Sequence, residues 1–264
     1  MAKHGTIGIA VDERGVATVT LNRPERRNAF SGEMISELAA AAAELGSDSS
    51  IRVIVMAAAG TVFCAGADLE WMRSQFGAPP DVQRDQAVKL ANMLNDWNMV
   101  PKPVIARVQG NSFGGGLGLM AVADVVLANE DARFGLTETR LGLIPATISP
   151  YLFARMGEAG ARRMFLSGRL VGGREAVDVK LISRSIAMAN LDVAVGEEVD
   201  ACLACAPGAI ADAKAMLRRL ADNPPEDLIN ATAGWLADRW RDPEAQEGLA
   251  AFFERRSPAW AKSG

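Results

Sequence analysis

Apolar and polar positions alternate along the first part of the chain with the period of β-strands. Residues 6–11 and 16–21 alternate in this way around a short polar turn, which predicts a β-hairpin. The period then becomes helical, with Ser31 placed to cap a helix and Gly46 placed to end it. The apolar run at 52–57 predicts a buried strand. The beginning of the chain therefore predicts strands that pack against a helix.

The order strand, turn, helix occurs twice in the middle of the chain. One such unit covers residues 52–76 and the next covers residues 103–122, with a predicted helix at 81–99 between them. Strand character returns at 124–128. Alternation of this kind predicts an α/β fold.

The pattern changes in the carboxyl-terminal part. Beyond Pro145 the spacing of apolar residues is helical almost throughout. We expect two parts, a core over residues 1–200 that contains the functional site and a helical region over residues 201–264. The start of the chain lacks the apolar segment of a secretory signal, and no apolar run approaches the ~20 residues that span a bilayer. We therefore expect a cytoplasmic protein that does not bind membranes.

Composition excludes some classes of function. The 264 residues include 28 basic and 32 acidic side chains, and a net charge of −4 gives no overall attraction to nucleic acid. Cys202 and Cys205 have the spacing of a metal-binding pair, but no second pair accompanies them and His4 is the sole histidine. We expect no metal site. A hydrolase with a serine, histidine and carboxylate triad is excluded, because His4 is the only imidazole in the sequence.

Three consecutive glycines, Gly114 to Gly116, separate the predicted strand at 103–108 from the helix that follows it. Glycines leave the backbone open to close approach by another group. Amide groups at the start of a helix have no intrahelical acceptor and lie at the positive end of the helix dipole. The turn therefore predicts a site that stabilises negative charge developing on a bound oxygen.

Short motifs occur on both sides of this turn in a particular order and spacing. They are Asn22-Arg23-Pro24, Ala65-Gly66-Ala67-Asp68, Gly114-Gly115-Gly116, Phe134-Gly135 with Glu138, Leu141-Gly142-Leu143-Ile144-Pro145 and Phe252-Phe253-Glu254-Arg255-Arg256. In this arrangement the chain resembles the enoyl-CoA hydratase/isomerase (crotonase) superfamily over nearly its whole length. The resemblance implies a spiral of ββα units with a helical carboxyl-terminal region that forms trimers, often as a dimer of trimers. It also implies an acyl-CoA thioester as substrate and no cofactor.

The resemblance assigns roles by position. It implies that the backbone amides of Ala67 and Gly115 form an oxyanion hole for the thioester oxygen. It further implies that the substrate or its coenzyme A part is contacted by Arg26, Arg27, Ala65, Gly66, Asp68, Leu69, Gly114 and Arg255. Asp68 can also cap the helix that follows it, and Arg255 would reach a phosphate of a neighbouring subunit.

One position departs from the pattern of the family. Hydratases of this kind usually carry two glutamates, but Gly118 stands in the first position and only Glu138 remains. Hydration needs a group that deprotonates water and a source of the proton delivered to C2. We expect Glu138 to serve as the sole general acid and base, and Gly118 to mark the absent carboxylate.

The single-glutamate pattern is similar to bacterial methylglutaconyl-CoA and isohexenylglutaconyl-CoA hydratases, in the glycine turn and at residues 143–150. This likeness implies a 3-methylglutaconyl-CoA-like substrate. Its distal carboxylate is expected to occupy the space left beside Gly118.

Three alternatives remain open on the sequence alone. An enoyl-CoA isomerase would use the same single base. A non-catalytic protein of the same fold would bind acyl-CoA or RNA. Finally, Gly116, Gly118 and Ala121 satisfy the spacing of a dinucleotide fingerprint, which would indicate a nucleotide-dependent oxidoreductase.

Overall fold

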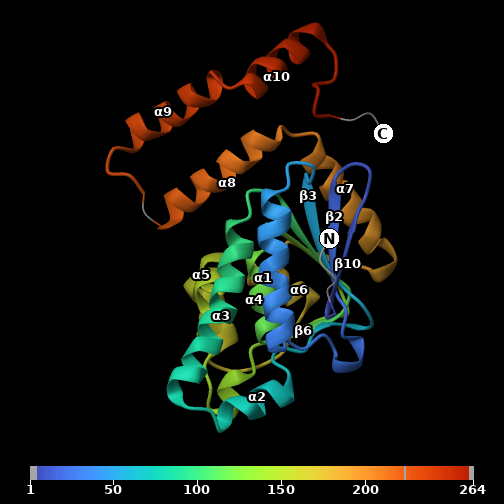
Figure 1. Ribbon diagram of the computed structural model, residues 1–264, viewed down its shortest axis with the longest axis vertical. Coiled ribbons are helices and arrows are strands. Elements are labelled where there is room, and N and C mark those ends of the chain that lie inside the picture. The colour runs from blue at the N-terminus through green and yellow to red at the C-terminus, as the bar shows by residue number, and fades with distance from the viewer. Residues whose placement is uncertain (1–4, 223, 262–264) are drawn as a thin grey trace.

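The computed structural model describes residues 5–222 and 224–261 and contains two β-sheets with helices around them (Figure 1). The larger sheet has the order β1-β2-β3-β5-β7-β10, and only its β1–β2 pair is antiparallel. Its strands are β1 (Ile7–Val11), β2 (Val16–Leu21), β3 (Val53–Ala58), β5 (Val104–Val108), β7 (Val125–Asn129) and β10 (Arg184–Ile186). The smaller sheet has the order β4-β6-β8-β9 and consists of β4 (Val62–Cys64), β6 (Asn111–Phe113), β8 (Arg133–Gly135) and β9 (Val171–Gly172).

The two sheets are built by repeated ββα units. The pairs β3–β4, β5–β6 and β7–β8 each place one strand in the larger sheet and the next strand in the smaller one. Helices of the core are α1 (Gly32–Ser47), α2 (Leu69–Phe76), α3 (Pro80–Met99), α4 (Gly115–Val122), α5 (Ser149–Phe165), α6 (Gly173–Asp178) and α7 (Leu191–Leu203), with short 3-10 helices η1 (Pro24–Arg26), η2 (Glu138–Leu141) and η3 (Met188–Asn190). This arrangement confirms the α/β spiral that the sequence predicts.

Apolar side chains cover both faces of the larger sheet, because neighbouring residues of a strand point to opposite faces. In β3, Ile54 and Met56 belong to the main core with α1, α3 and α4. Val53 and Val55 belong to a second cluster on the other face, which α7 covers with Leu191, Ala194, Val195 and Val199. The larger sheet is therefore a middle layer between helices.

Several local predictions are confirmed and others need correction. The hairpin is present, and the Ser31 side chain accepts a hydrogen bond from the Met34 amide at the start of α1. Gly46 lies inside α1, which ends one residue later, so the predicted stop is slightly early. The segment beyond Pro145 also contains the short strands β9 and β10, which the helical pattern did not indicate.

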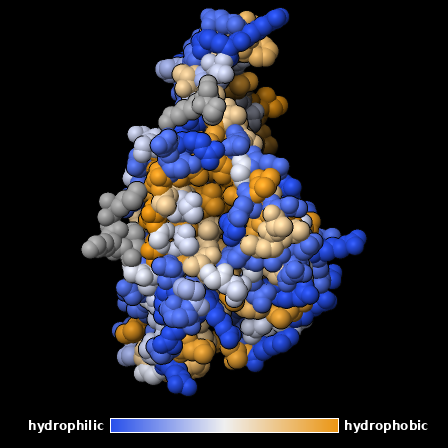
Figure 2. Space-filling view, turned by 90° about the vertical axis from the view of Figure 1, so that its right-hand side faces the viewer, coloured by the Kyte–Doolittle hydropathy of each residue, from blue (hydrophilic) through white to orange (hydrophobic). Residues whose placement is uncertain are grey.

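The carboxyl-terminal helices form an arm whose first helix contacts the body, with Lys214 paired to Asp124 at 2.7 Å, and whose last two helices stand away from it (Figures 1 and 2). This arm comprises α8 (Pro207–Asp222), α9 (Leu228–Trp240) and α10 (Pro243–Glu254). The boundary expected at residue 200 falls inside α7, which packs on the sheet, so the arm begins only after that helix. Among the described residues, no helix is long and apolar enough to cross a membrane.

Candidate active site

Two loops at the same edge of the smaller sheet form the centre of the site. Strands β4 and β6 are parallel neighbours, so the loop after β4, residues 65–68, and the glycine turn after β6 lie side by side. Gly66 has a φ of +90°, and the Phe30 amide donates to its carbonyl oxygen at 2.7 Å. A methyl group placed on Gly66 would lie 3.3 Å from the Phe113 carbonyl oxygen. Close contact between the two loops therefore requires glycine at this position.

The two backbone amides expected to bind an oxyanion are free of other backbone partners. Within the described part of the chain, the amides of Ala67 and Gly115 donate no hydrogen bond, whereas those of Asp68 and Gly114 donate to Phe30 and Gly135. Gly115 is the first residue of α4, where amides lack intrahelical acceptors. Both Ala67 and Gly115 line one cavity. The two residues with unused amide donors thus line the same cavity.

The carboxylate of Glu138 reaches the glycine turn from a third segment. Glu138 is the first residue of η2, which follows β8, the neighbour of β6. A methyl group placed on Gly114 would lie 3.1 Å from Glu138 Oε1 and 3.6 Å from the Gly66 Cα atom. Gly114 also has a φ of +49°, which side chains disfavour. The glycine at position 114 therefore permits the Glu138 carboxylate and the loop at residues 65–68 to approach each other.

Burial changes the acidity of this carboxylate. Glu138 Oε2 is buried and has no hydrogen-bond partner among the described residues. Burial raises the pKa of Glu138 above its usual value, and a hydrogen bond from its own backbone amide opposes this only in part. A carboxyl group with a raised pKa in a cavity is suited to take up and return a proton.

These groups line a cavity of about 580 Å³. Ala65, Gly66, Leu69 and Gly114 also line it, as the sequence suggests. Its walls come from α2, α3, the segment 137–148 and part of α1, and include Trp71, Met72, Gln75, Phe76, Gln83, Gln86, Ala87, Leu90, Leu143, Ile144 and Ile148. Sequence reasoning missed Gln75, Gln83 and Gln86, because polar residues on a helix are typical of a solvent-exposed face.

The space expected beside Gly118 is absent. A methyl group placed on Gly118 would lie 2.4 Å from Cγ2 of Ile148 and 3.4 Å from Cδ1 of Leu94. Ile148 is 2% exposed and belongs to the main core. The expectation that a substrate carboxylate enters this space is therefore wrong, because an isoleucine side chain already fills it. Gly118 permits close packing of α4 against the start of α5.

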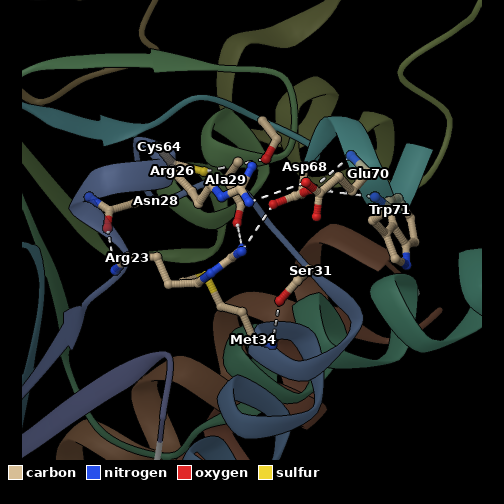
Figure 3. A network of polar contacts seen from close by, with 11 residues as sticks. Arg23, Arg26, Asn28, Ala29, Ser31, Met34, Cys64, Asp68, Glu70 and Trp71 are labelled. Atoms are coloured by element: carbon tan, nitrogen blue, oxygen red, sulfur yellow. Dashed lines mark hydrogen bonds and ion pairs between the residues drawn. The ribbon is translucent and has the colours of Figure 1, made fainter. Parts of the chain in front are cut away.

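Asp68 has a structural role that the sequence also suggested. Its carboxylate caps α2 by accepting hydrogen bonds from the Glu70 and Trp71 amides, and it pairs with Arg23 at 3.0 Å (Figure 3). Burial by itself raises the pKa of Asp68, but these hydrogen bonds and the Arg23 charge outweigh it and lower the pKa. Asp68 is 4% exposed and does not line the cavity. It fixes the loop that presents Ala67.

The three arginines assigned to coenzyme A lie outside the cavity. Arg26 is exposed and pairs with Glu70 at the first turn of α2 (Figure 3). Arg27 is exposed one residue further along and has a φ of +52°. Arg255 is the residue that follows α10. Helix α10 lies at the far end of the molecule from α2 (Figure 1), so the chain by itself does not bring Arg255 to the site.

The dinucleotide fingerprint has the wrong structural context. Such a motif needs its glycines in the turn between strand and helix. Here Gly116 and Gly118 lie inside α4 and are buried against neighbouring side chains. The oxidoreductase interpretation is therefore abandoned. His4, on which the exclusion of a hydrolase triad depended, lies outside the described residues.

The fold and the paired amide donors define an α/β enzyme of the crotonase fold. The sequence profile described as enoyl-CoA hydratase/isomerase matches residues 12–263. An enoyl-CoA hydratase from Shewanella pealeana has a crystal structure that superposes with a TM-score of 0.94 at 36% identity, covering 98% of this chain and 97% of that one. Pseudomonas aeruginosa AtuE gives the same TM-score and identity over 98% and 100% of the two chains.

The sequence of a curated protein is similar to this chain as well. A Thermus thermophilus protein with a provisional enoyl-CoA hydratase name is 35% identical over 95% of this chain and 99% of its own length. The chain belongs to the enoyl-CoA hydratase/isomerase family, and it is an enzyme of that family.

Proposed function

We propose that this enzyme adds water across the double bond of a 2-enoyl-CoA thioester, with Glu138 as its only general acid and base. The observation that carries the proposal is the Glu138 carboxylate, whose Oε2 atom is buried without a hydrogen-bond partner among the described residues, against the turn that contains the free Gly115 amide. The names of the relatives support an enoyl-CoA substrate.

The proposed mechanism needs only one carboxylate. The thioester oxygen accepts hydrogen bonds from the amides of Ala67 and Gly115. Ionised Glu138 takes a proton from water, the water oxygen bonds to C3, and the π electrons of the C2–C3 bond move onto the thioester oxygen as an enolate. Protonated Glu138 then gives that proton to C2. One water is added and the carboxylate is regenerated; each oxyanion donor typically contributes about 10²–10³ in rate.

An isomerase is the second candidate, favoured by the same single carboxylate. A base that removes a proton at C2 and returns it at C4 interconverts 2-enoyl and 3-enoyl thioesters without water. The amides of Ala67 and Gly115 would stabilise the same type of enolate.

Coenzyme A would be held outside the cavity. We propose that Arg26 and Arg27 bind its phosphates, because guanidinium groups suit phosphate oxygens and both side chains are exposed next to the loop that carries Ala67. In a homotrimer or a dimer of trimers, Arg255 of a neighbouring subunit would add to this site.

Product analysis distinguishes the two reactions. The enzyme is incubated separately with 2-octenoyl-CoA and 3-octenoyl-CoA in water enriched in the heavy isotope of oxygen. The products are separated, and their molecular masses are measured by mass spectrometry. The proposal predicts a 3-hydroxyoctanoyl-CoA that carries the heavy oxygen, formed from the 2-enoyl ester. Conversion of the 3-enoyl ester to the 2-enoyl ester with no hydroxylated product would establish the isomerase instead.

A further inference from the structure

Phe30, just before the cap of α1, is joined through its backbone to the loop that carries Ala67. The two residues form an isolated parallel β-bridge. The Phe30 amide donates to the Gly66 carbonyl oxygen at 2.7 Å, and the Phe30 carbonyl oxygen accepts from the Asp68 amide at 2.9 Å. These bonds use the groups on either side of Ala67, and successive amides of an extended segment alternate in direction. The bridge therefore fixes Ala67 while its own amide points away from Phe30.

The side chain of Phe30 contacts the second donor of the site. A methyl group placed on Gly115 would lie 2.9 Å from Phe30 Cδ2 and 3.1 Å from Phe30 Cε2, and its three nearest atoms all belong to this ring. Phe30 is 2% exposed and belongs to the main core, and both residues line the cavity. A ring packed in this way has little freedom to move. The first residue of α4 is therefore held directly against the Phe30 ring.

Two polar side chains hold the segment before α1 in place. Asn28 is fully buried, and its side-chain amide donates to two carbonyl oxygens of the segment 59–62, at 2.8 Å each. Arg23 donates to the Ala29 carbonyl oxygen at 2.8 Å and pairs with Asp68 at 3.0 Å (Figure 3). One guanidinium group thus ties together the two segments that form the bridge. The bridge belongs to a rigid network of hydrogen bonds.

We propose that Phe30 is a positioning residue that sets the separation of the two oxyanion donors. Its backbone fixes the loop that presents the Ala67 amide, and its ring fixes the residue that presents the Gly115 amide. This inference rests on the proposed function in placing a thioester oxygen between these amides. An oxyanion hole works only when both donors lie about 2.7–3.1 Å from the oxygen, so a small displacement of either donor weakens it.

A substitution that keeps the bridge and removes the ring tests the proposal. Phe30→Val retains the backbone hydrogen bonds and deletes the atoms that contact Gly115. We expect kcat for hydration of 2-octenoyl-CoA to fall by about tenfold to 100-fold, the cost of a displaced donor. KM should change little, because the two amides bind the transition state more strongly than the ground state.

A matched control separates positioning from a loss of core packing. Leu38→Ala deletes a similar number of buried carbon atoms from α1, at a position that is 0% exposed, belongs to the same core and does not line the cavity. This variant should lower the Tm, as Phe30→Val does, but leave kcat unchanged. Equal losses of kcat in the two variants would overturn the proposal, because general destabilisation would then explain both.

A spectroscopic measurement reports the oxyanion donors themselves. Octanoyl-CoA labelled with ¹³C at the thioester carbonyl is bound to each protein, and the carbonyl stretching band is recorded by infrared difference spectroscopy. Hydrogen bonds from two amides polarise the carbonyl and lower its stretching frequency. The unaltered enzyme and Leu38→Ala should show the full shift from the free thioester, and Phe30→Val only part of it. A full shift in Phe30→Val would overturn the proposal.

The contact between the ring and Gly115 also predicts a rescue. Gly115→Ala puts a methyl group against the ring and should lower kcat by about 100-fold, because it displaces one donor. Adding Phe30→Val removes the clash, so the double variant should recover about tenfold in kcat relative to Gly115→Ala alone. A double variant with a lower kcat than Gly115→Ala would contradict the proposal.

The infrared measurement separates this inference from the proposed reaction, because it needs no turnover. If hydration is not the reaction but Phe30→Val still loses part of the carbonyl shift that Leu38→Ala retains, the proposed function fails and the positioning role stands. If the unaltered enzyme hydrates 2-octenoyl-CoA and Phe30→Val keeps both its kcat and the full shift, the positioning role fails and the proposed function stands.

Discussion

Glu138 is a buried carboxylate whose negative charge is costly to the fold and useful to the reaction. Its Oε2 atom has no partner among the described residues, and burial raises its pKa. A carboxyl group with a raised pKa in the folded state stabilises the protein below its unfolded pKa and loses that contribution as the pH rises through the folded pKa. At neutral pH the folded protein therefore bears the cost of an ionised, poorly hydrated group.

This leads to a prediction about stability. Glu138→Gln should raise the Tm at pH 7 by about 2–4 °C, the shift that about 1 kcal/mol produces in a protein near this size, because the neutral amide avoids the cost of the buried charge. Near pH 4.5 the difference should shrink, because a raised pKa means that more of the glutamate is protonated there than at pH 7. Thermal unfolding followed by circular dichroism at both pH values checks this. A lower Tm at pH 7 would contradict it.

The pKa of Glu138 also sets the acid limit of catalysis. The proposed mechanism needs the ionised carboxylate in the free enzyme, so kcat/KM should fall as the pH decreases through a pKa above the ordinary glutamate value of 4.5. A pH profile of kcat/KM measured between pH 4.5 and 9 tests this. Activity that continues unchanged down to pH 4.5 would show that Glu138 does not act as the base.

Gly118 and Ile148 pack against each other, and the small residue leaves room for the large one. Gly118→Ala should destabilise the protein by about 1–3 kcal/mol, the usual range for overpacking, because the new methyl group would lie 2.4 Å from Ile148 Cγ2. Ile148→Ala alone should cost about 2–5 kcal/mol through the cavity it leaves. The double variant should be less destabilised than the sum, because the methyl group enters the vacated space. Denaturant unfolding of all three variants measures the coupling, and simple additivity would contradict it.

At the residue scale, the sequence could predict the groups that belong to short local motifs. Ala67, Gly115 and Glu138 were assigned by position, and all three line the cavity. The contact of Gly118 with Ile148 could not be predicted, because the two residues are 30 positions apart and only the packing of α4 against α5 joins them. The apparent vacancy at Gly118 was therefore misinterpreted.

At the element scale, α2 links the loop that carries Ala67 to the wall of the cavity. Asp68 both caps this helix and pairs with Arg23, while Trp71, Met72 and Phe76 line the cavity. Asp68→Ala should cost about 1–2 kcal/mol in stability, the upper range for a lost cap, and should lower kcat/KM by releasing the Ala67 loop. Asp68→Asn retains a capping oxygen and should recover most of the loss. Steady-state kinetics on both variants test this, and equal losses would contradict it.

Elements long enough to show a regular hydrophobic period could be predicted from the sequence, whereas very short elements could not. The hairpin, α1, β3, α3 and β5 follow clear periods of two or of three to four residues. Strands β9 and β10 have two and three residues, too few for a period to be recognised, and they form because β8 and β7 supply their partners. Met93, Leu94 and Trp97 of α3 follow the helical period and are core residues with no exposed surface.

At the scale of the whole molecule, the arm carries apolar surface that one chain does not cover. Ile229, Leu236 and Trp240 of α9 are 82%, 61% and 53% exposed and recur at a spacing that puts them on one helical face. The trimer implied by the sequence resemblance would bury this face.

We therefore predict that the oligomer depends on this face. Sedimentation or light scattering should give three or six times the chain mass of 28.0 kDa, and the double variant Ile229→Glu, Leu236→Glu should dissociate, because burying two charges in an apolar interface is unfavourable. Asp238→Asn, on the opposite face of α9, should keep the oligomer. A monomeric unaltered protein would contradict the prediction.

Exchange of the C2 protons of a saturated thioester tests most directly that two amides and one carboxylate act on the same substrate. Octanoyl-CoA is incubated with the enzyme in deuterated water, and deuterium incorporation at C2 is followed by mass spectrometry. The unaltered enzyme should catalyse the exchange, and Glu138→Gln, with octanoyl-CoA still bound, should slow it by about 10²–10⁴, the contribution of a general base. Equal exchange rates in the two proteins would contradict the role given to Glu138.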